Sequence, residues 1–479
     1  MPSASGLDRR WILVLLSLVA LWPLSPAQGQ EVPTAPQPAA PTVPAFPPSL
    51  PLPLTPSGPE RWVTETPIRA LPLAPPAVTA APIRAQLFLT VEEEFTDNTN
   101  QTRDNRKSEF RTSIAPGFAA GIEGAQTSLN LVYAPRFFFR SDRFDDPKVD
   151  HDLTLRSGWS PSPFVRLSLA EDLVKSSDFR YVQDPGTRRT GTAAYLTNQG
   201  TLGAAYTPPN GRIGLSYSNV LQRNDAPGAD SSLTHTMRTD GQVTGPRLSL
   251  GGSYALTRGE FDISSPYWEH SLDARATRVV TPAVSAVLSG LFTYHDPEKD
   301  PNLMVGRVRL GGTGTLGQYG SLGAEVGVGV FAQQNESAKV RPSILFTWTQ
   351  EFAVFSLSAR LQQDYQENFQ QVTNTGVTFA RSAGLVLTSS GLLFRDLTAT
   401  LRASWGENSF QQTIPGPGGV AAGTVDRTWD LGAEIRYLIV RGLSLVLGYT
   451  ATIRTSTDAT AEFLENRVRL GLTYQYDIF

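Results

Sequence analysis

Apolar and polar residues alternate through most of the chain between Gln86 and Phe479, and this pattern limits the fold more than any other feature. In the clearest segment, every second residue from Leu443 to Ile453 is apolar. Similar segments begin at Leu153, Leu248, Val284 and Leu397. Because successive side chains of a strand point to opposite faces, the pattern predicts many β-strands that each carry one apolar face.

The breaks between these segments alternate between tight turns and longer polar loops. Turns such as Glu123-Gly124, Gly245-Pro246 and Arg441-Gly442 contain residues that turn dihedrals favour. Loops such as residues 96–106, 141–147 and 406–423 are longer. Short turns at one end and long loops at the other are typical of outer-membrane barrels. We therefore predict an all-β, transmembrane, antiparallel up-and-down β-barrel of about twenty strands, or about eighteen, in the outer membrane of a Gram-negative bacterium.

Composition narrows the class further. Charged residues make up 18% of the chain, below the ~25% usual for soluble domains. No internal stretch approaches the ~20 consecutive apolar residues of a transmembrane helix. The net charge of −3 gives no electrostatic footprint for nucleic acid. Because the chain has no cysteine, it has no disulfide, thiolate metal site, cysteine nucleophile or lipoprotein anchor.

The first 84 residues differ in texture from the rest. Residues 1–29 carry Arg9 and Arg10 before a short apolar run, which predicts a cleaved signal peptide. Residues 30–84 are dense in Pro and Ala, and Pro disfavours both helix and central strand. We expect this segment to be a disordered periplasmic tether, either a plain spacer or a partner-binding segment. Residues 85–479 are then the barrel.

Residues capable of catalysis are few and scattered. His151, His235, His270 and His295 form no HExxH pair and no ligand-like spacing. His151 and His295 have Asp neighbours, but adjacent strand residues point to opposite faces. We therefore expect no enzyme activity, no cofactor and no metal site, and we interpret the acidic loops as solvated. An enzyme built on a barrel is kept as an alternative to a channel.

Arginine is the characteristic polar residue of the predicted inner face. A charged side chain on the lipid face costs roughly 2–4 kcal/mol near the midplane, so we expect the strand arginines to point into the lumen. The candidates are Arg156, Arg166, Arg247, Arg275, Arg307, Arg309, Arg341, Arg360, Arg402, Arg436, Arg467 and Arg469. Two interpretations stay open: a ladder of ion pairs that stiffens the wall, and a positive lining that attracts anionic solutes or an acidic glycan.

The last strand resembles the closing strand by which the barrel-assembly machinery recognises its clients. Tyr474 and Tyr476 lie in its apolar phase, and the chain ends on an aromatic residue, Phe479. These three residues are the candidate assembly signal. The apolar phase ends at Ile478, so Phe479 is one step out of phase, and a bulge or final twist is needed to absorb the offset.

Deletion of Phe479 is expected to slow assembly, because the terminal aromatic is then missing from the signal. Heat-modifiable mobility in gel electrophoresis and the yield of folded barrel measure the effect. Normal mobility and yield of the deletion variant would remove Phe479 from the assembly signal.

A short region at the start of the barrel carries a family resemblance. Residues 92–98 read Glu-Glu-Glu-Phe-Thr-Asp-Asn, and residues 107–117 end in Ser113-Ile114-Ala115-Pro116-Gly117. Together with the Tyr-Gln-Tyr-Asp-Ile-Phe ending, this resembles the outer-membrane β-barrel proteins associated with exopolysaccharide or exosortase gene clusters. The resemblance implies a role in moving or anchoring surface polysaccharide, and it supplies no catalytic residues.

These inferences lead to two functional hypotheses that share one fold. The first is an outer-membrane channel that supports export or surface presentation of exopolysaccharide through a polar, Arg-lined lumen. The alternative is a general or anion-preferring porin for small solutes. The expected partners are outer-membrane lipid and lipopolysaccharide, the barrel-assembly machinery and, for the first hypothesis, an acidic polysaccharide with export components. No nucleic-acid partner is expected.

Overall fold

The structure is a computed structural model, and it describes residues 83–141, 143–176, 195–224, 231–368, 376–390, 396–413 and 420–478. All of these residues belong to one compact unit, residues 55–479. The predicted signal peptide and the predicted tether up to residue 82 lie outside the described residues, and so does Phe479. The first strand already begins at Ile83.

Twenty-one strand segments and one short 3-10 helix make up the regular structure of the described residues. Their bounds are β1 (Ile83–Thr96), β2 (Glu109–Glu123), β3 (Thr127–Tyr133), β4 (Arg136–Arg140), β5 (Arg143–Ser162), β6 (Val165–Ser176), β7 (Tyr195–Tyr206), β8 (Gly211–Asn224), β9 (Ser232–Thr244), β10 (Leu248–Phe261), β11 (Tyr267–Thr281), β12 (Val284–Pro297), β13 (Leu303–Thr315), β14 (Gly320–Gln333), β15 (Lys339–Glu351), β16 (Phe355–Asn368), β17 (Gly376–Ser390), β18 (Leu397–Phe410), β19 (Val425–Val440), β20 (Leu443–Ser456), η2 (Ala459–Ala461) and β21 (Phe463–Asp477). Within the described ranges, no helix is long and apolar enough to cross a membrane.

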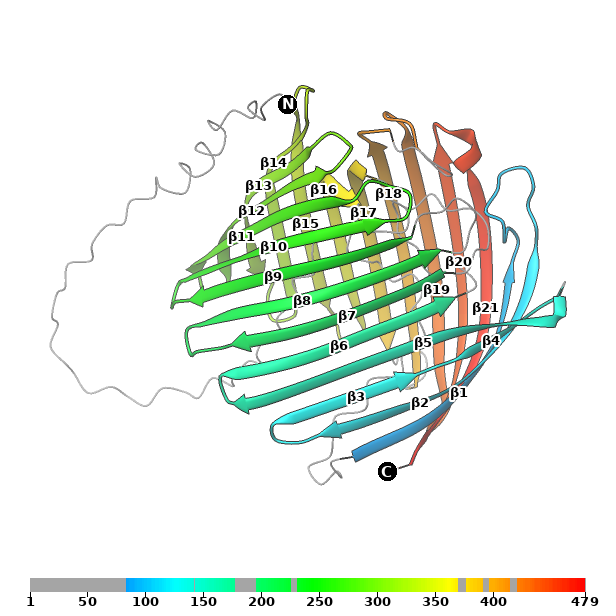
Figure 1. Ribbon diagram of the computed structural model, residues 1–479. Helices are drawn as coiled ribbons and strands as arrows, with labels where there is room; N and C mark the ends of the chain where they lie inside the picture. Colours follow the sequence, from blue (N-terminus) through cyan, green and yellow to red (C-terminus); the bar gives the residue numbers. More distant parts are fainter. Residues whose placement is uncertain are drawn as a thin grey trace, which may run out of the picture. The chain divides into compact units, whose positions relative to one another are not determined.

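The strands form one closed antiparallel sheet in which neighbours in the chain are neighbours in space (Figure 1). β3 and β4 both pair with β2 and with β5, so they are two halves of one strand. The interruption falls at Pro135, which lacks the amide hydrogen that a ladder needs. The twenty-one segments described therefore make a wall of twenty strands. β1 pairs with β21 from Gln86–Asp477 to Thr96–Arg467, and this pairing closes the ring.

Most hairpins follow the predicted alternation of tight turns and longer connections. Between β19 and β20, Gly442 has a φ of +83°, which glycine adopts without strain. A Cβ at this position would lie 2.5 Å from the carbonyl oxygen of Gln475, so the turn requires glycine. One predicted loop, residues 141–147, is wrong, because β5 begins at Arg143 and pairs with β4. The segment has the polar composition that is typical of a loop, although it is extended from Arg143 onward.

Each strand presents an apolar outer face and a mainly polar inner face. On β21, Leu470 and Leu472 point outward and are 48% and 41% exposed, whereas Glu465 and Arg467 point inward and are 2% and 7% exposed. Exposed apolar side chains over a whole outer face need lipid around them. The prediction of an all-β, antiparallel barrel of about twenty strands is confirmed.

Candidate functional site: the arginine-lined inner face

Ion pairs between strands that are not neighbours identify the concave face of the sheet. Arg275 on β11 contacts Glu325 on β14 at 3.0 Å, and Arg309 on β13 contacts Asp364 on β16 at 2.6 Å. In a flat sheet, strands three positions apart are separated by roughly 14 Å. Side chains that meet across this span must converge on the inside of a curved wall. This face is the lumenal face of the barrel.

The register places eleven of the twelve candidate arginines on this inner face. They are Arg156, Arg166, Arg275, Arg307, Arg309, Arg341, Arg360, Arg402, Arg436, Arg467 and Arg469. Arg247 differs, because it is exposed in the turn between β9 and β10. The turn that begins at Gly245-Pro246 extends through Arg247, and β10 starts one residue later.

Glycines lie directly opposite many of these arginines on the neighbouring strand. Arg402 pairs with Gly432, and Arg469 pairs with Gly448. A Cβ at Gly432 would lie 3.6 Å from the Nε atom of Arg402, and a Cβ at Gly448 would lie 3.5 Å from the Nε atom of Arg469. Each arginine side chain therefore extends over the glycine of the neighbouring strand. The same direct pairing joins Arg275 with Gly251, Arg307 with Gly329, Arg309 with Gly327 and Arg360 with Gly384. This arrangement was not predicted from the sequence. The available sequence signal was the high glycine content of several strands.

Strands β18 to β21 carry a cluster of arginines and carboxylates that continues onto β1. Arg469 contacts Glu434 at 2.9 Å and Glu92 of β1 at 3.7 Å. Arg467 contacts Glu465 at 3.2 Å, and both side chains are almost completely buried. Thus at least part of the arginine lining forms the ion-pair ladder that the first interpretation describes.

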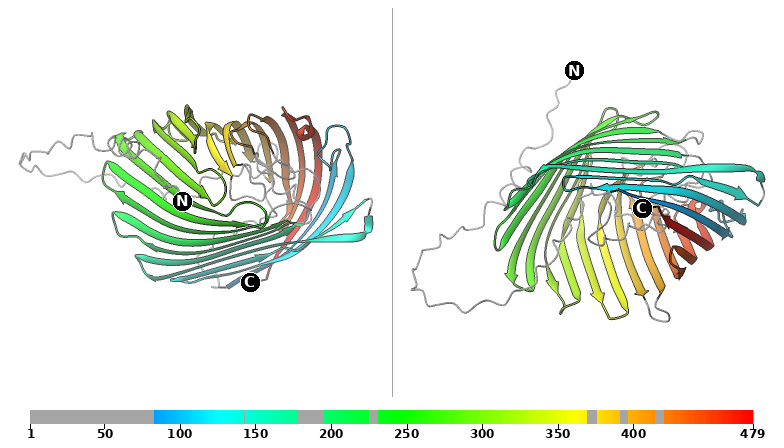
Figure 2. Two further views of the ribbon diagram at one scale, coloured as in Figure 1. Left: turned by 45° about the horizontal axis from the view of Figure 1, so that its top comes forward. Right: turned by 90° about the horizontal axis from the view of Figure 1, so that it is seen from below.

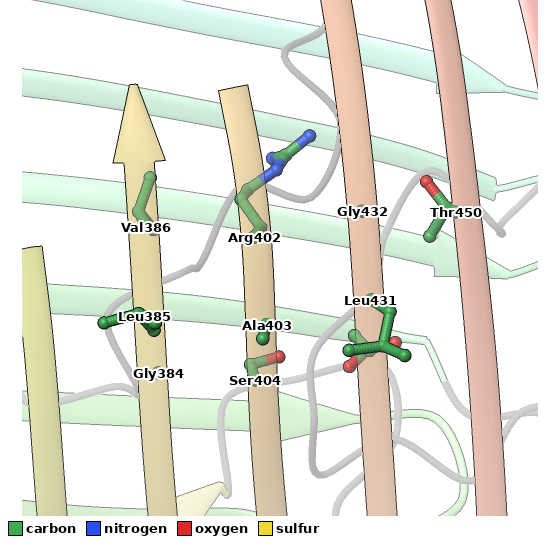
Figure 3. A pocket seen from close by; sticks show the side chains of 10 residues that line it. Gly384, Leu385, Val386, Arg402, Ala403, Ser404, Leu431, Gly432 and Thr450 are labelled. Atoms are coloured by element: carbon green, nitrogen blue, oxygen red, sulfur yellow. The ribbon is translucent and has the colours of Figure 1, made fainter. Parts of the chain in front are cut away.

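Two shallow hollows lie on this part of the inner face, and Arg402 lines both of them. In Figure 3 the Arg402 side chain extends from β18 toward Gly432 and β19, with Ser404 below it. The second hollow adds Glu434, Arg467 and Arg469 to the lining. Guanidinium, carboxylate and hydroxyl groups therefore alternate over these strands, as a hydrophilic, charged solute requires.

The loop-proximal end of β16 leaves the wall and turns into the lumen. Pairing between β15 and β16 ends at Ile344–Gln363, whereas pairing between β16 and β17 continues to Asn368–Gly376. The Tyr365 ring lies 3.2 Å from the position of a Cβ on Gly329, which belongs to the inner face of β14. In the left view of Figure 2, the yellow ends of these strands turn toward the interior of the ring. The inward end narrows the lumen on this side.

A buried apolar cluster holds this inward end against the inner wall. Its members are Tyr267, Leu303, Val305, Phe331, Tyr365, Val377 and Phe379, with Phe261 packed against them. The ring of Tyr365 lies 5.9 Å from that of Phe331 and 5.2 Å from that of Phe379. The Arg341 guanidinium lies 4.6 Å above the Phe379 ring. Apolar residues in the inner phase of β13 and β14 were the available sequence signal for this cluster.

Asp364 anchors the same inward end by charge. Its Oδ2 atom accepts hydrogen bonds from Arg307 at 2.8 Å and from Arg309 at 2.6 Å. Arg309 also donates to the hydroxyl of Ser343 at 2.6 Å. The side chains of Asp364 and Arg309 are 1% and 4% exposed. One carboxylate thus neutralises two arginines of β13 at the point where the inward end of β16 leaves the wall.

The histidines do not gather at the inner face. His151, His235 and His270 lie on the outer face, where each ring nitrogen Nδ1 is 2.7 to 3.0 Å from a tyrosine hydroxyl. His295 faces inward, 3.5 Å from Glu269. The described residues contain no group of three His, Cys, Asp or Glu side chains that could hold a metal ion.

Comparison with known proteins finds a family that is similar to part of this wall. Residues 359–476, which run from β16 to β21, match the family described as "Putative beta-barrel porin 2". A search of curated proteins found no match.

Solved structures resemble the whole barrel. The siderophore receptor PirA of Acinetobacter baumannii has a TM-score of 0.51 at 9% identity, over 84% of this chain and 81% of that chain. A mutant of the ferric enterobactin receptor PfeA of Pseudomonas aeruginosa has a TM-score of 0.50 at 11% identity, over 82% and 80%. OccK7 of Pseudomonas aeruginosa has a TM-score of 0.41 at 14% identity, over 84% and 100%. At these identities the likeness concerns the fold alone.

Proposed function

We propose that this chain, a porin-like outer-membrane β-barrel, is a channel that supports export or surface presentation of an exopolysaccharide. The observation that carries the proposal is the track of arginines along the inner face of β18 to β21, where Arg402, Arg467 and Arg469 line adjoining hollows. A barrel of about twenty strands is too wide for side chains alone to fill, so the track borders a water-filled lumen.

The orientation of the channel follows from the lengths of its turns and loops. Short turns of outer-membrane barrels face the periplasm, and long loops face the outside. We infer that Ile83 and Asp477 lie at the periplasmic end and that residues preceding the barrel are periplasmic. The inward end of β16 then narrows the lumen near its outer mouth.

Weak, exchangeable contacts suit the passage of an acidic chain. Guanidinium groups bind sugar carboxylates in two-point hydrogen bonds. Because Arg469 already has Glu434 and Glu92 within 4 Å, a passing carboxylate exchanges with a wall carboxylate. Binding that is favourable enough for entry and weak enough for exit is what conduction needs.

The second candidate function is an anion-preferring porin for small solutes. The constriction formed by the ends of β16 and β17 favours it, because a narrowed lumen passes small solutes more readily than a polymer. The description of the matching family also points to a porin.

Current through single channels in a planar bilayer separates the two candidates. We expect an acidic polysaccharide such as polygalacturonate to interrupt the current from either side, since its carboxylates occupy the arginine track. Neutral dextran of the same length is the control and should interrupt it far less. Large, stable open channels that ignore polygalacturonate would reject export and leave the porin.

A further inference from the structure

A row of basic side chains crosses the outer face of the barrel at the loop-proximal ends of β5 to β8. His151 pairs directly with Lys175, Lys175 with Leu196, and Leu196 with Arg223. Direct partners on one face of neighbouring strands lie about 5 Å apart. The row therefore runs from His151 to Lys175 and, across Leu196, to Arg223, and Lys175 and Arg223 are exposed.

The height of this row matches the outer edge of the apolar band. A strand rises ~3.3 Å per residue and tilts by roughly 40°, which gives about 2.5 Å per residue along the membrane normal. Lys175 follows Val165, the first residue of β6, by about ten residues and so lies about 25 Å above the periplasmic end. This height equals the ~25 Å of the outward apolar band, so the row lies at the headgroups of the outer leaflet.

Apolar side chains lie directly beneath the basic row. Two residues closer to the periplasm on the same outer face are Leu153, Leu173 and Leu221, with Asn198 between the last two. In addition, Nδ1 of His151 lies 3.0 Å from the Tyr133 hydroxyl, and the two rings stack. The surface thus presents cations above and hydrocarbon below, which is complementary to an anionic lipid standing in the leaflet.

We propose that this row is a binding site for a phosphate-bearing lipid headgroup of the outer leaflet. The phosphate lies between Lys175 and Arg223 and accepts hydrogen bonds from both, while His151 borders it. The acyl chains lie along Leu153, Leu173 and Leu221. Charged groups at the headgroup level cost little by themselves, and exposed cations at the membrane surface attract anionic lipid headgroups.

Titration of the purified barrel in detergent with phosphatidic acid, followed by native mass spectrometry, tests this site. We expect Lys175→Gln combined with Arg223→Gln to weaken binding roughly thirtyfold, since each basic residue near the surface contributes about a factor of five. The control is Arg278→Gln combined with Arg441→Gln. It removes the same charge at the turn end, where both side chains are exposed, and should leave binding unchanged.

Two results would overturn the proposal. One is equal binding of phosphatidic acid to the wild type and to the Lys175→Gln, Arg223→Gln variant, whose heat-modifiable mobility shows that it has folded. The other is full displacement of the lipid by an equal concentration of inorganic phosphate, which would mark a site for free phosphate. Binding of phosphatidic acid that phosphate does not displace, and that the variant loses, supports the lipid site.

Discussion

Replacement of Asp364 by alanine is expected to lower the free energy of unfolding by about 3–5 kcal/mol, because it leaves two arginines without their shared counter-ion in a buried position. Asp364 and Arg309 are almost completely buried, and Arg307 reaches the same carboxylate oxygen. Removing one partner of a buried pair costs far more than the pair contributes when intact. Urea titration of the folded barrel in detergent measures the loss.

The matched control is Asp172→Ala. Asp172 also pairs with an arginine on the inner face, Arg156, but the two side chains are 37% and 47% exposed. A pair so exposed contributes about 0–1 kcal/mol, so this variant should be nearly as stable as the wild type. Similar losses for both variants would contradict the assignment of Asp364 as the anchor of the inward end.

The Asp364→Ala variant should also have a wider channel. Without its charge anchor, the end of β16 loses its buried ionic attachment to β13, and the apolar cluster around Tyr365 and Phe331 holds it less firmly. We expect a higher single-channel conductance for Asp364→Ala than for the wild type, and an unchanged conductance for Asp172→Ala. Equal conductance in all three proteins would mean that the inward end does not limit ion flow.

The second large effect is expected from Arg402→Gln, Arg436→Gln and Arg469→Gln combined. These arginines lie on the inner face of β18, β19 and β21, and none is fully buried. Their removal takes Arg469 away from Glu434 and Glu92 and makes the charge of the wall more negative. We expect the preference for anions over cations to fall by roughly tenfold, the lower end of what focused charge does to local ion concentration. Reversal potentials in a salt gradient measure it.

An equal change of charge on the outer face is the control. Arg258, Arg278 and Arg427 point outward, and their replacement by glutamine should leave ion selectivity unchanged. Heat-modifiable mobility shows whether each triple variant has assembled. Equal shifts in selectivity for both triple variants would show that net charge, and not the lumenal lining, sets the preference.

The barrel was predictable from sequence because its determinants are local. The alternation around residues 443–453 fixes which side chains share a face, and Gly442 marks its turn by itself. Arg247 was misplaced because a turn that begins at a glycine and a proline includes the next residue as well. The loop predicted at residues 141–147 failed for another reason, since a segment rich in Asp is typical of a loop, whereas β5 already begins at Arg143.

The constriction was not predictable from sequence because its determinants are far apart in the chain. Asp364 follows Arg309 by more than fifty residues, and only the inward turn of β16 brings them together. The glycines opposite the arginines depend in the same way on register. Strand register is a property of the closed ring, so no single segment reveals which glycine faces which arginine.

Arg402 pairs with Gly432, and Arg469 pairs with Gly448. In each pair, the glycine influences the width of the pore and the arginine supplies its charge. A side chain bulkier than alanine at Gly432 would lift Arg402 off the wall toward the pore axis, and the number of charges would stay the same. A change at Arg402 itself would alter the charge and leave the backbone as it is. Bore and selectivity are therefore set by different residues of one cross-strand pair, so each can change without the other.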